Sequence, residues 1–279
     1  MSKPAKVSIN PIDHPRSYPR RIVCLTAETT ELLYALGAGD RVVGVSGYSV
    51  RPPEAREKPK ISAFTTAKMD KILELKPDLV LAFSDLQADI AKDLIKQGVN
   101  VLALNQRSIA ETLQTALWIG RILGLEGQAG KYVAMFETVI QDAKTQAAAF
   151  PKKPKVYFEE WDEPMISGIA WVSEIIEIAG GKDVFPELSI RKSATERIVK
   201  SEEVARRNPE IILASWCGKK AQLEKIKSRP GWNKIAAVKN NEVFEIKSPD
   251  ILQPGPSLLR GLRQIQDIIA ERVGAGAKA

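Results

Sequence analysis

The two halves of this sequence present the same series of signals in the same order. In the first half an apolar strand begins at Ile22, and a second begins 57 positions later at Leu79, directly after a Lys-Pro-Asp turn. In the second half the matching strands begin at Val156 and Ile211, 55 positions apart, and an Asn-Pro-Glu turn precedes the later one. The duplication predicts two similar lobes, and a cleft between two lobes is the usual place for a small-molecule ligand.

Within each half, short apolar strands alternate with helices, which is the rhythm of a parallel sheet. Ser84 with Gln87 and Ser108 with Glu111 have the spacing of capping boxes at helix starts. The alternation stops at 127–149, where apolar residues recur at helical spacing over a long stretch. We therefore predict an α/β protein with two Rossmann-like lobes, each around a central, mainly parallel sheet, joined by one long interlobe helix. The expected divisions are a polar leader at 1–19, an N-terminal lobe at 20–126, a connecting helix at 127–150 and a C-terminal lobe at 151–279.

The composition is that of a folded protein with scattered charge. The 44% of hydrophobic residues let each lobe bury its own core, and the net charge of +7 comes from Lys and Arg spread along the chain. No helix-turn-helix and no RNA-type aromatic-basic motif stands out, so we expect no nucleic-acid partner. No stretch approaches the ~20 apolar residues of a membrane span, so we expect no membrane insertion. The expected oligomeric state is a monomer.

The N-terminal residues and the cysteines bear on the compartment. Residues 1–21 are basic but contain no apolar run of seven or more, so we expect no signal peptide and a cytoplasmic location unless a leader has been removed. His14, the single histidine, lies in this leader, and we expect no metal site built from several histidines. Cys24 and Cys217 fall in different lobes, so we expect no disulfide, with Cys24 in the core.

Catalytic signatures are few. The sequence contains no G-x-x-x-x-G-K-[ST], G-x-S-x-G or H-E-x-x-H motif. Four carboxylates cluster at the end of the strand that begins at Val156, and they are Glu159, Glu160, Asp162 and Glu163. A pair of them could act as acid and base, but the simpler interpretation is a strand exit whose acids cap helices or pair with nearby lysines. We therefore assign no catalytic residue.

Aromatic side chains gather at predicted strand exits and at the loops that follow. In parallel α/β sheets ligands bind outside the carboxyl ends of the strands, so rings from both lobes would form a stacking surface for a large flat ligand. For any single ring, core packing is the alternative. Trp118, in the middle of a predicted helix, is expected in the core. The candidate ligand-binding rings are Tyr48, Phe64, Phe83, Trp161, Trp171 and Trp216.

Three phrases carry a resemblance to a known family. They are the runs at 72–81 (ILELKPDLVL), 177–181 (EIAGG) and 208–212 (NPEII). Over about residues 20–272 the chain resembles the substrate-binding proteins of ABC importers for cobalamin and ferric siderophores, the class of periplasmic binding proteins with a helical interlobe backbone. The cobalamin-binding branch matches best.

The resemblance implies roles for particular residues. Tyr48, Phe64 and Phe83 match aromatic positions of the cleft, and Trp161 lies in a matching region of the second lobe. Asp250 matches an aspartate of a late loop. In our own hypothesis for the site, polar groups such as Asp250 and Arg260 would fix the orientation of the ligand. Two carboxylates, Asp70 and Glu202, match those that dock onto arginines of the permease. The chain departs from the branch where two cleft tryptophans correspond to Phe64 and Phe83, and where the polar stretch near Glu196 replaces a third.

Three functional hypotheses follow. The first is a non-catalytic solute-binding protein that holds cobalamin or a related corrinoid as its ligand, has no cofactor and delivers to an ABC permease. The second is a ferric siderophore or haem binding protein, in which Tyr48 could ligate iron. The third is a cytosolic relative without a signal peptide that handles corrinoids or acts as an enzyme with Glu160 or Asp162 as base. The family is periplasmic, whereas residues 1–21 predict no export signal.

Overall fold

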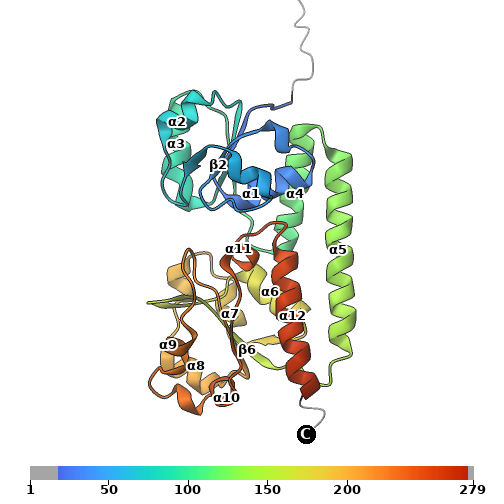
Figure 1. Ribbon diagram of the computed structural model, residues 1–279, viewed down its shortest axis with the longest axis vertical. Helices are drawn as coiled ribbons and strands as arrows, with labels where there is room; N and C mark the ends of the chain where they lie inside the picture. Colours follow the sequence, from blue (N-terminus) through green and yellow to red (C-terminus); the bar gives the residue numbers. More distant parts are fainter. Residues whose placement is uncertain (1–17, 276–279) are drawn as a thin grey trace, which may run out of the picture.

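The computed structural model describes residues 18–275 and shows two α/β lobes stacked end to end (Figure 1). Most of the predicted leader, including His14, lies outside the described residues. The sheet of the N-terminal lobe has the order β3-β2-β1-β4-β5 and is parallel throughout. Its strands are β1 (Ile22–Cys24), β2 (Val42–Ser46), β3 (Lys60–Ser62), β4 (Leu79–Phe83) and β5 (Val101–Leu104). Its helices are α1 (Ala27–Ala35), η1 (Gly39–Arg41), η2 (Pro53–Glu57), α2 (Met69–Glu74), η3 (Asp85–Gln87), α3 (Ala88–Lys96) and α4 (Ile109–Leu123).

The C-terminal lobe repeats the plan. Its sheet has the order β10-β9-β6-β7, with β8 also paired to β6, and every pair is parallel except β6 with β7. Its strands are β6 (Lys155–Asp162), β7 (Met165–Ser167), β8 (Lys182–Asp183), β9 (Ile211–Ala214) and β10 (Val243–Glu245). Its helices are α6 (Ala170–Ile178), α7 (Pro186–Ser189), η4 (Ala194–Arg197), α8 (Ser201–Arg207), α9 (Leu223–Lys227), η5 (Trp232–Lys234), α10 (Ala236–Lys239), α11 (Ser248–Ile251) and α12 (Leu258–Ala275).

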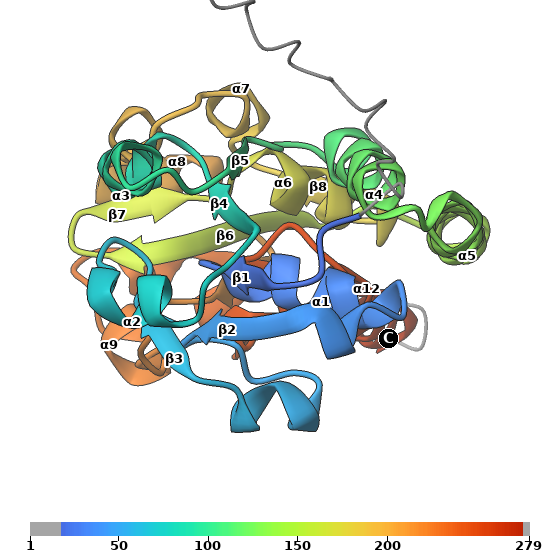
Figure 2. The same cartoon turned by 90° about the horizontal axis from the view of Figure 1, so that it is seen from above.

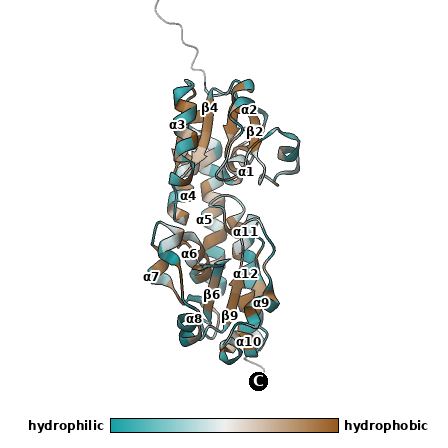
Figure 3. Cartoon of the chain, turned by 90° about the vertical axis from the view of Figure 1, so that its left-hand side faces the viewer, coloured by the Kyte–Doolittle hydropathy of each residue, from teal (hydrophilic) through white to brown (hydrophobic). Residues whose placement is uncertain are grey.

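The repeated sequence signals are the central strand pair of each sheet. Ile22 pairs with Leu79 between β1 and β4, and Val156 pairs with Ile211 between β6 and β9. These strands are almost wholly apolar because helices cover both faces of a parallel sheet. In Figure 3 the strands are brown and helices such as α3 and α8 are largely teal. The largest cluster of buried apolar residues includes strands of both sheets, such as Ile22 and Val156, so the core continues from one lobe into the other.

One helix joins the lobes, as the sequence predicts. Helix α5 (Glu126–Ala148) has 23 residues, which gives a length of about 35 Å at 1.5 Å per residue. It runs beside both lobes in Figures 1 and 2, packing against α4 in the first lobe and against α6 and α12 in the second. The Gln266 side chain of α12 donates a hydrogen bond to the Ala143 carbonyl of α5 at 2.8 Å. The C-terminal lobe is therefore fixed to the connecting helix and not suspended from a flexible linker.

Direct contacts also hold the lobes together. The Trp171 backbone N–H donates to the Arg107 carbonyl at 3.2 Å. In the loop before α12, Gly255 lies against α1 so closely that a Cβ atom there would be 2.8 Å from the Glu28 Cβ. Only glycine allows this approach of the two lobes. The cleft between them is therefore largely pre-formed.

Two details of the helices differ from expectation. Trp118 is 51% exposed, because α4 buries the face that carries Ala116, Ile119 and Leu123 and turns Trp118 outward. The capping box of Ser108 and Glu111 is present at the start of α4, whereas Ser84 and Gln87 do not form one.

Within residues 18–275, no helix combines the length and the apolar character needed to cross a membrane. Cys24 is buried and Cys217 exposed, and neither forms a disulfide.

Candidate functional site

A cavity of about 790 Å³ lies between the lobes, at the carboxyl ends of the strands. In the N-terminal lobe its lining residues follow all five strands, and in the C-terminal lobe they follow or end β6, β9 and β10. Figure 2 views the molecule along the line that joins the lobes, with the strands of one sheet over those of the other. Both sheets therefore contribute their ligand-binding edge to one site, as the duplicated sequence predicts.

The N-terminal lobe supplies three aromatic rings to this cavity. The rings of Phe64 and Phe83 lie with their centroids 6.5 Å apart, and the Arg107 guanidinium is 5.4 Å from the centre of the Phe83 ring. Tyr48 is 43% exposed and reaches the opposite lobe, since its hydroxyl is 3.9 Å from the place that a Cβ of Gly218 would occupy. These are the three rings that the cobalamin-branch resemblance singled out, and they share one cavity.

Gln87 positions two of these rings, and this role was not predicted from the sequence. Its side-chain amide donates to the Phe64 carbonyl at 2.7 Å, and its side-chain oxygen accepts from the Phe83 N–H at 2.9 Å. The Ser84–Gln87 spacing suggested a capping box, but Ser84 has a positive φ of 57° and Gln87 turns inward instead. Gln87 is fully buried just after a strand end, and this burial, visible only in the structure, indicates its positioning role.

The C-terminal lobe contributes its tryptophans in a different way. Trp171 and Trp216 line the cavity but are almost fully buried, and their indole N–H groups donate to the Ile251 carbonyl and to the Glu159 carboxylate. Trp161 is not among the lining residues. Lys219, which does line the cavity, has its Nζ 4.0 Å from the centre of the Trp161 ring. The structure thus brings five of the six predicted rings together and places a lysine over the sixth.

The carboxylates at the end of β6 are paired with cations. Glu160 accepts from Arg197 at 2.6 Å, and Asp162 accepts from Lys219 at 2.6 Å and from Lys225 at 3.2 Å. Burial raises the pKa of Asp162, but the hydrogen bonds from the two lysines outweigh it and hold the pKa below its usual value. A general base that works near neutral pH needs the opposite shift. This geometry fits the simpler interpretation of the cluster, which is a strand exit whose acids pair with nearby cations.

Asp250 and Arg260 do not line the cavity. The Asp250 carboxylate lies 2.6 Å from the Arg51 guanidinium and 3.0 Å from the Gln264 amide, and Arg260 is exposed on α12. The neighbours Pro249 and Leu252 line the cavity in their place. The ligand-orienting role of Asp250 and Arg260 stays a prediction, and in this structure Asp250 is engaged with another residue.

Polar residues that sequence reasoning did not select complete the site. The stretch near Glu196, expected to replace a tryptophan, gives the cavity a polar loop through Lys192, Ser193, Ala194, Thr195 and Arg197. Three lining lysines form no ion pair within residues 18–275, namely Lys192, Lys220 and Lys247. The cavity therefore combines an aromatic side with a side rich in hydrogen-bond donors. Such a lining suits a ligand with a flat apolar body and many polar acceptors at its rim.

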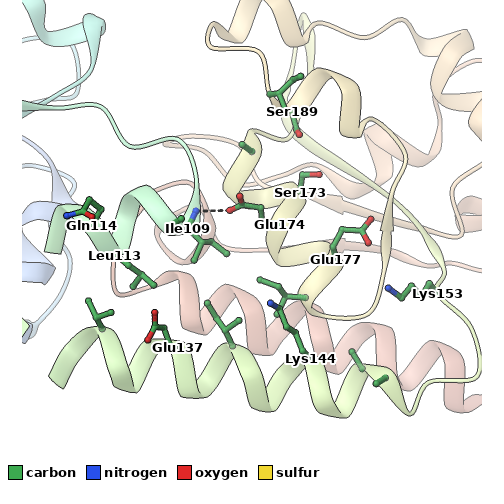
Figure 4. A pocket seen from close by; sticks show the side chains of 18 of the residues that line it. Ile109, Leu113, Gln114, Glu137, Lys144, Lys153, Ser173, Glu174, Glu177 and Ser189 are labelled. Atoms are coloured by element: carbon green, nitrogen blue, oxygen red, sulfur yellow. Dashed lines mark hydrogen bonds between the residues drawn. The ribbon is translucent and has the colours of Figure 1, made fainter. Parts of the chain in front are cut away.

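A larger groove of about 1020 Å³ lies elsewhere, between α4, α5 and α6 (Figure 4). Its lining mixes aliphatic side chains such as Leu113 and Ile140 with charged ones such as Glu137 and Lys144, and none of the described residues that line it is aromatic. Glu174 of α6 accepts a hydrogen bond from the Ile109 N–H at 2.7 Å and so caps α4 from the other lobe. The interlobe cavity is the stronger candidate site, because it has aromatic rings and charged groups at strand ends.

Comparison with known proteins agrees with this geometry. The family described as periplasmic binding protein matches residues 22–249. The chain belongs to the periplasmic binding protein family. An uncharacterized ABC transporter substrate-binding lipoprotein of Bacillus subtilis is 28% identical over 260 residues, which cover 90% of this chain and 80% of that protein. The vitamin B12-binding protein of Vibrio cholerae is 28% identical over 250 residues, which cover 88% of this chain and 87% of that protein.

Solved structures of this family share the fold. A possible iron-binding, periplasmic solute-binding protein of Staphylococcus epidermidis superposes with a TM-score of 0.78 at 27% identity, covering 91% of this chain and 99% of that one. The predicted family and the predicted fold class are therefore confirmed. The Bacillus subtilis protein is described as a lipoprotein that binds the substrate of an ABC transporter, and the Staphylococcus epidermidis protein as a periplasmic solute-binding protein.

The two predicted docking carboxylates of this family member lie on separate lobes. Asp70 is in the first turn of α2 and Glu202 in the first turn of α8, and both are exposed. In Figure 1 these helices belong to the upper and the lower lobe. An acid in the first turn of a helix also stabilises the helix dipole, which is the alternative reason for its presence.

Proposed function

We propose that this chain is the non-catalytic substrate-binding component of an ABC importer and carries a corrinoid in its interlobe cavity. The observation that supports the proposal is the cavity of about 790 Å³ with Tyr48, Phe64 and Phe83 on one side and a polar loop on the other. The likeness to the vitamin B12-binding protein of Vibrio cholerae supports a corrinoid as the ligand class. Because α5 and the direct interlobe contacts restrain the lobes, binding requires little domain motion.

We expect the two sides of the cavity to hold different parts of a corrinoid. The flat macrocycle packs against the rings of the N-terminal lobe, where stacking and burial of apolar area are gained together. The polar groups at the macrocycle rim face the loop at 192–197 and the lysines of the C-terminal lobe. The largest contribution is expected from Tyr48, because its exposed ring has the most area still to bury.

Replacing Tyr48 with alanine will weaken binding of cyanocobalamin by about 10- to 100-fold, because burial of one large side chain contributes about 1.5–3 kcal/mol. Quenching of tryptophan fluorescence during titration measures the dissociation constant. Trp118→Ala is the matched control, since that ring is similarly exposed but lies outside the cavity. Equal losses in the two variants, or wild-type protein that shows no quenching at high micromolar cyanocobalamin, would contradict the proposal.

The second candidate ligand is a ferric siderophore or haem. Lys192, Lys220 and Lys247, which have no ion-pair partner in the described part of the chain, favour an anionic ligand, and the Staphylococcus epidermidis protein is described as possibly iron-binding. Tyr48 is one lining side chain that could ligate iron, and Cys217 is another. A visible charge-transfer band on addition of haemin or a ferric siderophore, lost in Tyr48→Phe, would favour this ligand over a corrinoid.

Asp70 and Glu202 are proposed to dock onto the permease. Reversing both charges, Asp70→Lys with Glu202→Lys, will abolish formation of the complex with the permease while the dissociation constant of the ligand stays unchanged. Asp93→Lys with Glu224→Lys is the control, because it reverses one exposed acid on each lobe elsewhere. Co-purification with the permease in detergent measures the complex. Equal loss in both double variants would show that total charge, and not these two positions, governs docking.

The proposed role also fixes where the protein works. A substrate-binding component meets its permease on the outer face of the cytoplasmic membrane, so we propose a periplasmic or membrane-anchored location. The cytoplasmic location predicted from residues 1–21 belongs to the third hypothesis, in which no permease takes part. Cell fractionation with antibodies distinguishes the two.

A further inference from the structure

A second, very small cavity adjoins the ligand cavity. Its volume is about 10 Å³, which is close to the room that one water molecule needs. Glu28, in the first turn of α1, lines both this small cavity and the ligand cavity. The small cavity also reaches Gln106 after β5, Thr112 and Thr115 of α4, and Tyr132 of α5. It therefore lies where the ligand cavity meets the connecting helix.

Three buried polar atoms around this small cavity have no hydrogen-bond partner within residues 18–275. They are Glu28 Oε1, Gln106 Oε1 and the Tyr132 hydroxyl oxygen. Buried polar atoms without partners are rare, because each forfeits its hydrogen bond to water on folding. One water molecule would serve all three by accepting from the Tyr132 hydroxyl and donating to the two side-chain oxygens. Buried waters make about three such bonds.

The surroundings of Glu28 favour its neutral form. The residue is 5% exposed, no cation forms an ion pair with it within the described chain, and its charged neighbour on α1 is another acid, Glu31. The nearby Arg51 is already paired with Glu31 and with Asp250. Burial, with a smaller contribution from Glu31, raises the pKa of Glu28 to about 7. A neutral carboxyl group is a hydrogen-bond donor, which an ionised one is not.

We propose that Glu28 is a ligand-recognition residue of the interlobe cavity: its protonated carboxyl group donates a hydrogen bond to an oxygen acceptor of the ligand, and one buried water shared with Gln106 and Tyr132 holds the group in position. Gln106 and Tyr132 are thus positioning residues. The ligand contact rests on the proposed function, since the amide groups at a corrinoid rim supply the acceptors. The protonation of Glu28 and the buried water do not depend on the proposed function.

Other titratable groups surround Glu28, and an experiment must distinguish their titration from that of Glu28. They are Cys24 on β1, Glu31 on α1, Tyr132 on α5, and Arg107 and Lys247 in the lining of the ligand cavity, while Asp250 on α11 is paired with Arg51. Burial raises the pKa of Cys24 to about 12 and that of Tyr132 well above its usual value, so neither titrates between pH 5 and 8. Burial also raises the pKa of Glu31, so Glu31→Gln is the necessary control.

Thermal unfolding of the ligand-free protein tests the proton. The pKa of Glu28 is higher in the folded state than in the unfolded state, so the stability linked to its proton is present below about pH 4.5 and lost as the pH rises through about 7. Glu28→Gln removes this loss, so its Tm will gain on that of the wild type from pH 5 to pH 8, and the gain will persist in a Glu31→Gln background. If the Tm difference between Glu28→Gln and the wild type is constant over this range, Glu28 is ionised throughout. That result overturns the proposal, whatever the ligand.

Tyr132→Phe tests the water through the sign of its effect. If a water occupies the small cavity, the variant loses a satisfied hydrogen bond and its Tm falls. If the cavity is empty, the variant removes an unpartnered hydroxyl and its Tm rises. A rise overturns the water and with it the positioning of Glu28.

Titration with cyanocobalamin tests the ligand contact. With a pKa of about 7, the protonated fraction of Glu28 falls about tenfold between pH 6 and pH 8, so the dissociation constant of the wild type will rise by up to about tenfold. In Glu28→Gln, whose amide donates at every pH, the constant will be the same at both values. A rise that persists in Glu28→Gln overturns the contact. Absence of binding at both pH values overturns the contact together with the proposed function, while the unfolding experiments still decide the proton and the water.

Discussion

Replacing Arg229 with methionine will lower the free energy of unfolding by about 3–5 kcal/mol, the usual loss when one partner of a buried ion pair is removed. The Glu159 side chain is 0% exposed, and Arg229 approaches it with both terminal nitrogens. The same carboxylate also accepts from the Trp216 indole and the Tyr157 hydroxyl. Without Arg229 these two neutral donors remain beside a buried charge that no cation compensates.

Urea unfolding followed by circular dichroism measures this effect. Adding Glu159→Gln to Arg229→Met will restore most of the stability, because the buried charge is gone while the amide oxygen accepts from the Trp216 indole and the amide NH2 group donates to the Tyr157 hydroxyl, which can accept as well as donate. Arg206→Met is the control, since Arg206 pairs with Glu203 at the surface, where water screens the charges, and its loss will hardly move the midpoint. If Glu159→Gln gives no rescue, the charge of Glu159 is not the source of the loss.

The double-lobed fold could be predicted because its signals are local. A parallel strand that is covered on both faces must be an apolar run, so Leu79 and Ile211 mark their strands without any knowledge of the partner. The start of the helix at Ser108 can be predicted from a capping box that spans only three positions, from Ser108 to Glu111. The mid-helix position of Trp118 carried no such information, because which face of a helix is buried depends on what packs against it.

The site could be predicted only as far as strand exits define it. Tyr48, Phe64 and Phe83 follow strands of one sheet, and exits from one parallel sheet meet at one edge. The partner of Asp250 could not be foreseen in this way, because Arg51 lies 199 positions away in the other lobe. The position of Lys219 over the Trp161 ring likewise depends on how the loop after β9 folds against the end of β6. What the sequence lacks is the arrangement of segments that are distant along the chain.

The contact of Arg51 with Asp250 leads to a second large effect. Replacing Arg51 with methionine will lower the free energy of unfolding by about 3 kcal/mol, at the low end for a buried pair because 24% of the Arg51 side chain stays exposed. Arg51 belongs to the N-terminal lobe and donates to the Asp250 carboxylate, the Pro249 carbonyl and the Ser257 hydroxyl of the C-terminal lobe. Its removal breaks the charged contact between the lobes and leaves the carboxylates of Glu31 and Asp250 without their cation.

The loss will depend on pH in a way that identifies its cause. Burial raises the pKa of Glu31 whereas Ser257 and Arg51 lower it, so removal of Arg51 raises this pKa further. A raised folded-state pKa gives stability at low pH that is lost as the pH rises, so the deficit of Arg51→Met will be smaller at pH 5 than at pH 8. Urea unfolding at both values measures it, and adding Glu31→Gln with Asp250→Asn will remove most of the deficit and its pH dependence.

Lys152→Met is the control for this comparison, because Lys152 pairs with Glu210 within one lobe at a largely exposed position. A deficit in Arg51→Met no larger than in Lys152→Met, and equal at pH 5 and pH 8, would contradict the ionic account. The separation of the lobes would then depend on packing, chiefly on the approach of Gly255 to Glu28, and not on charge. In that case the pre-formed cleft would tolerate loss of every interlobe ion pair but not a side chain at position 255.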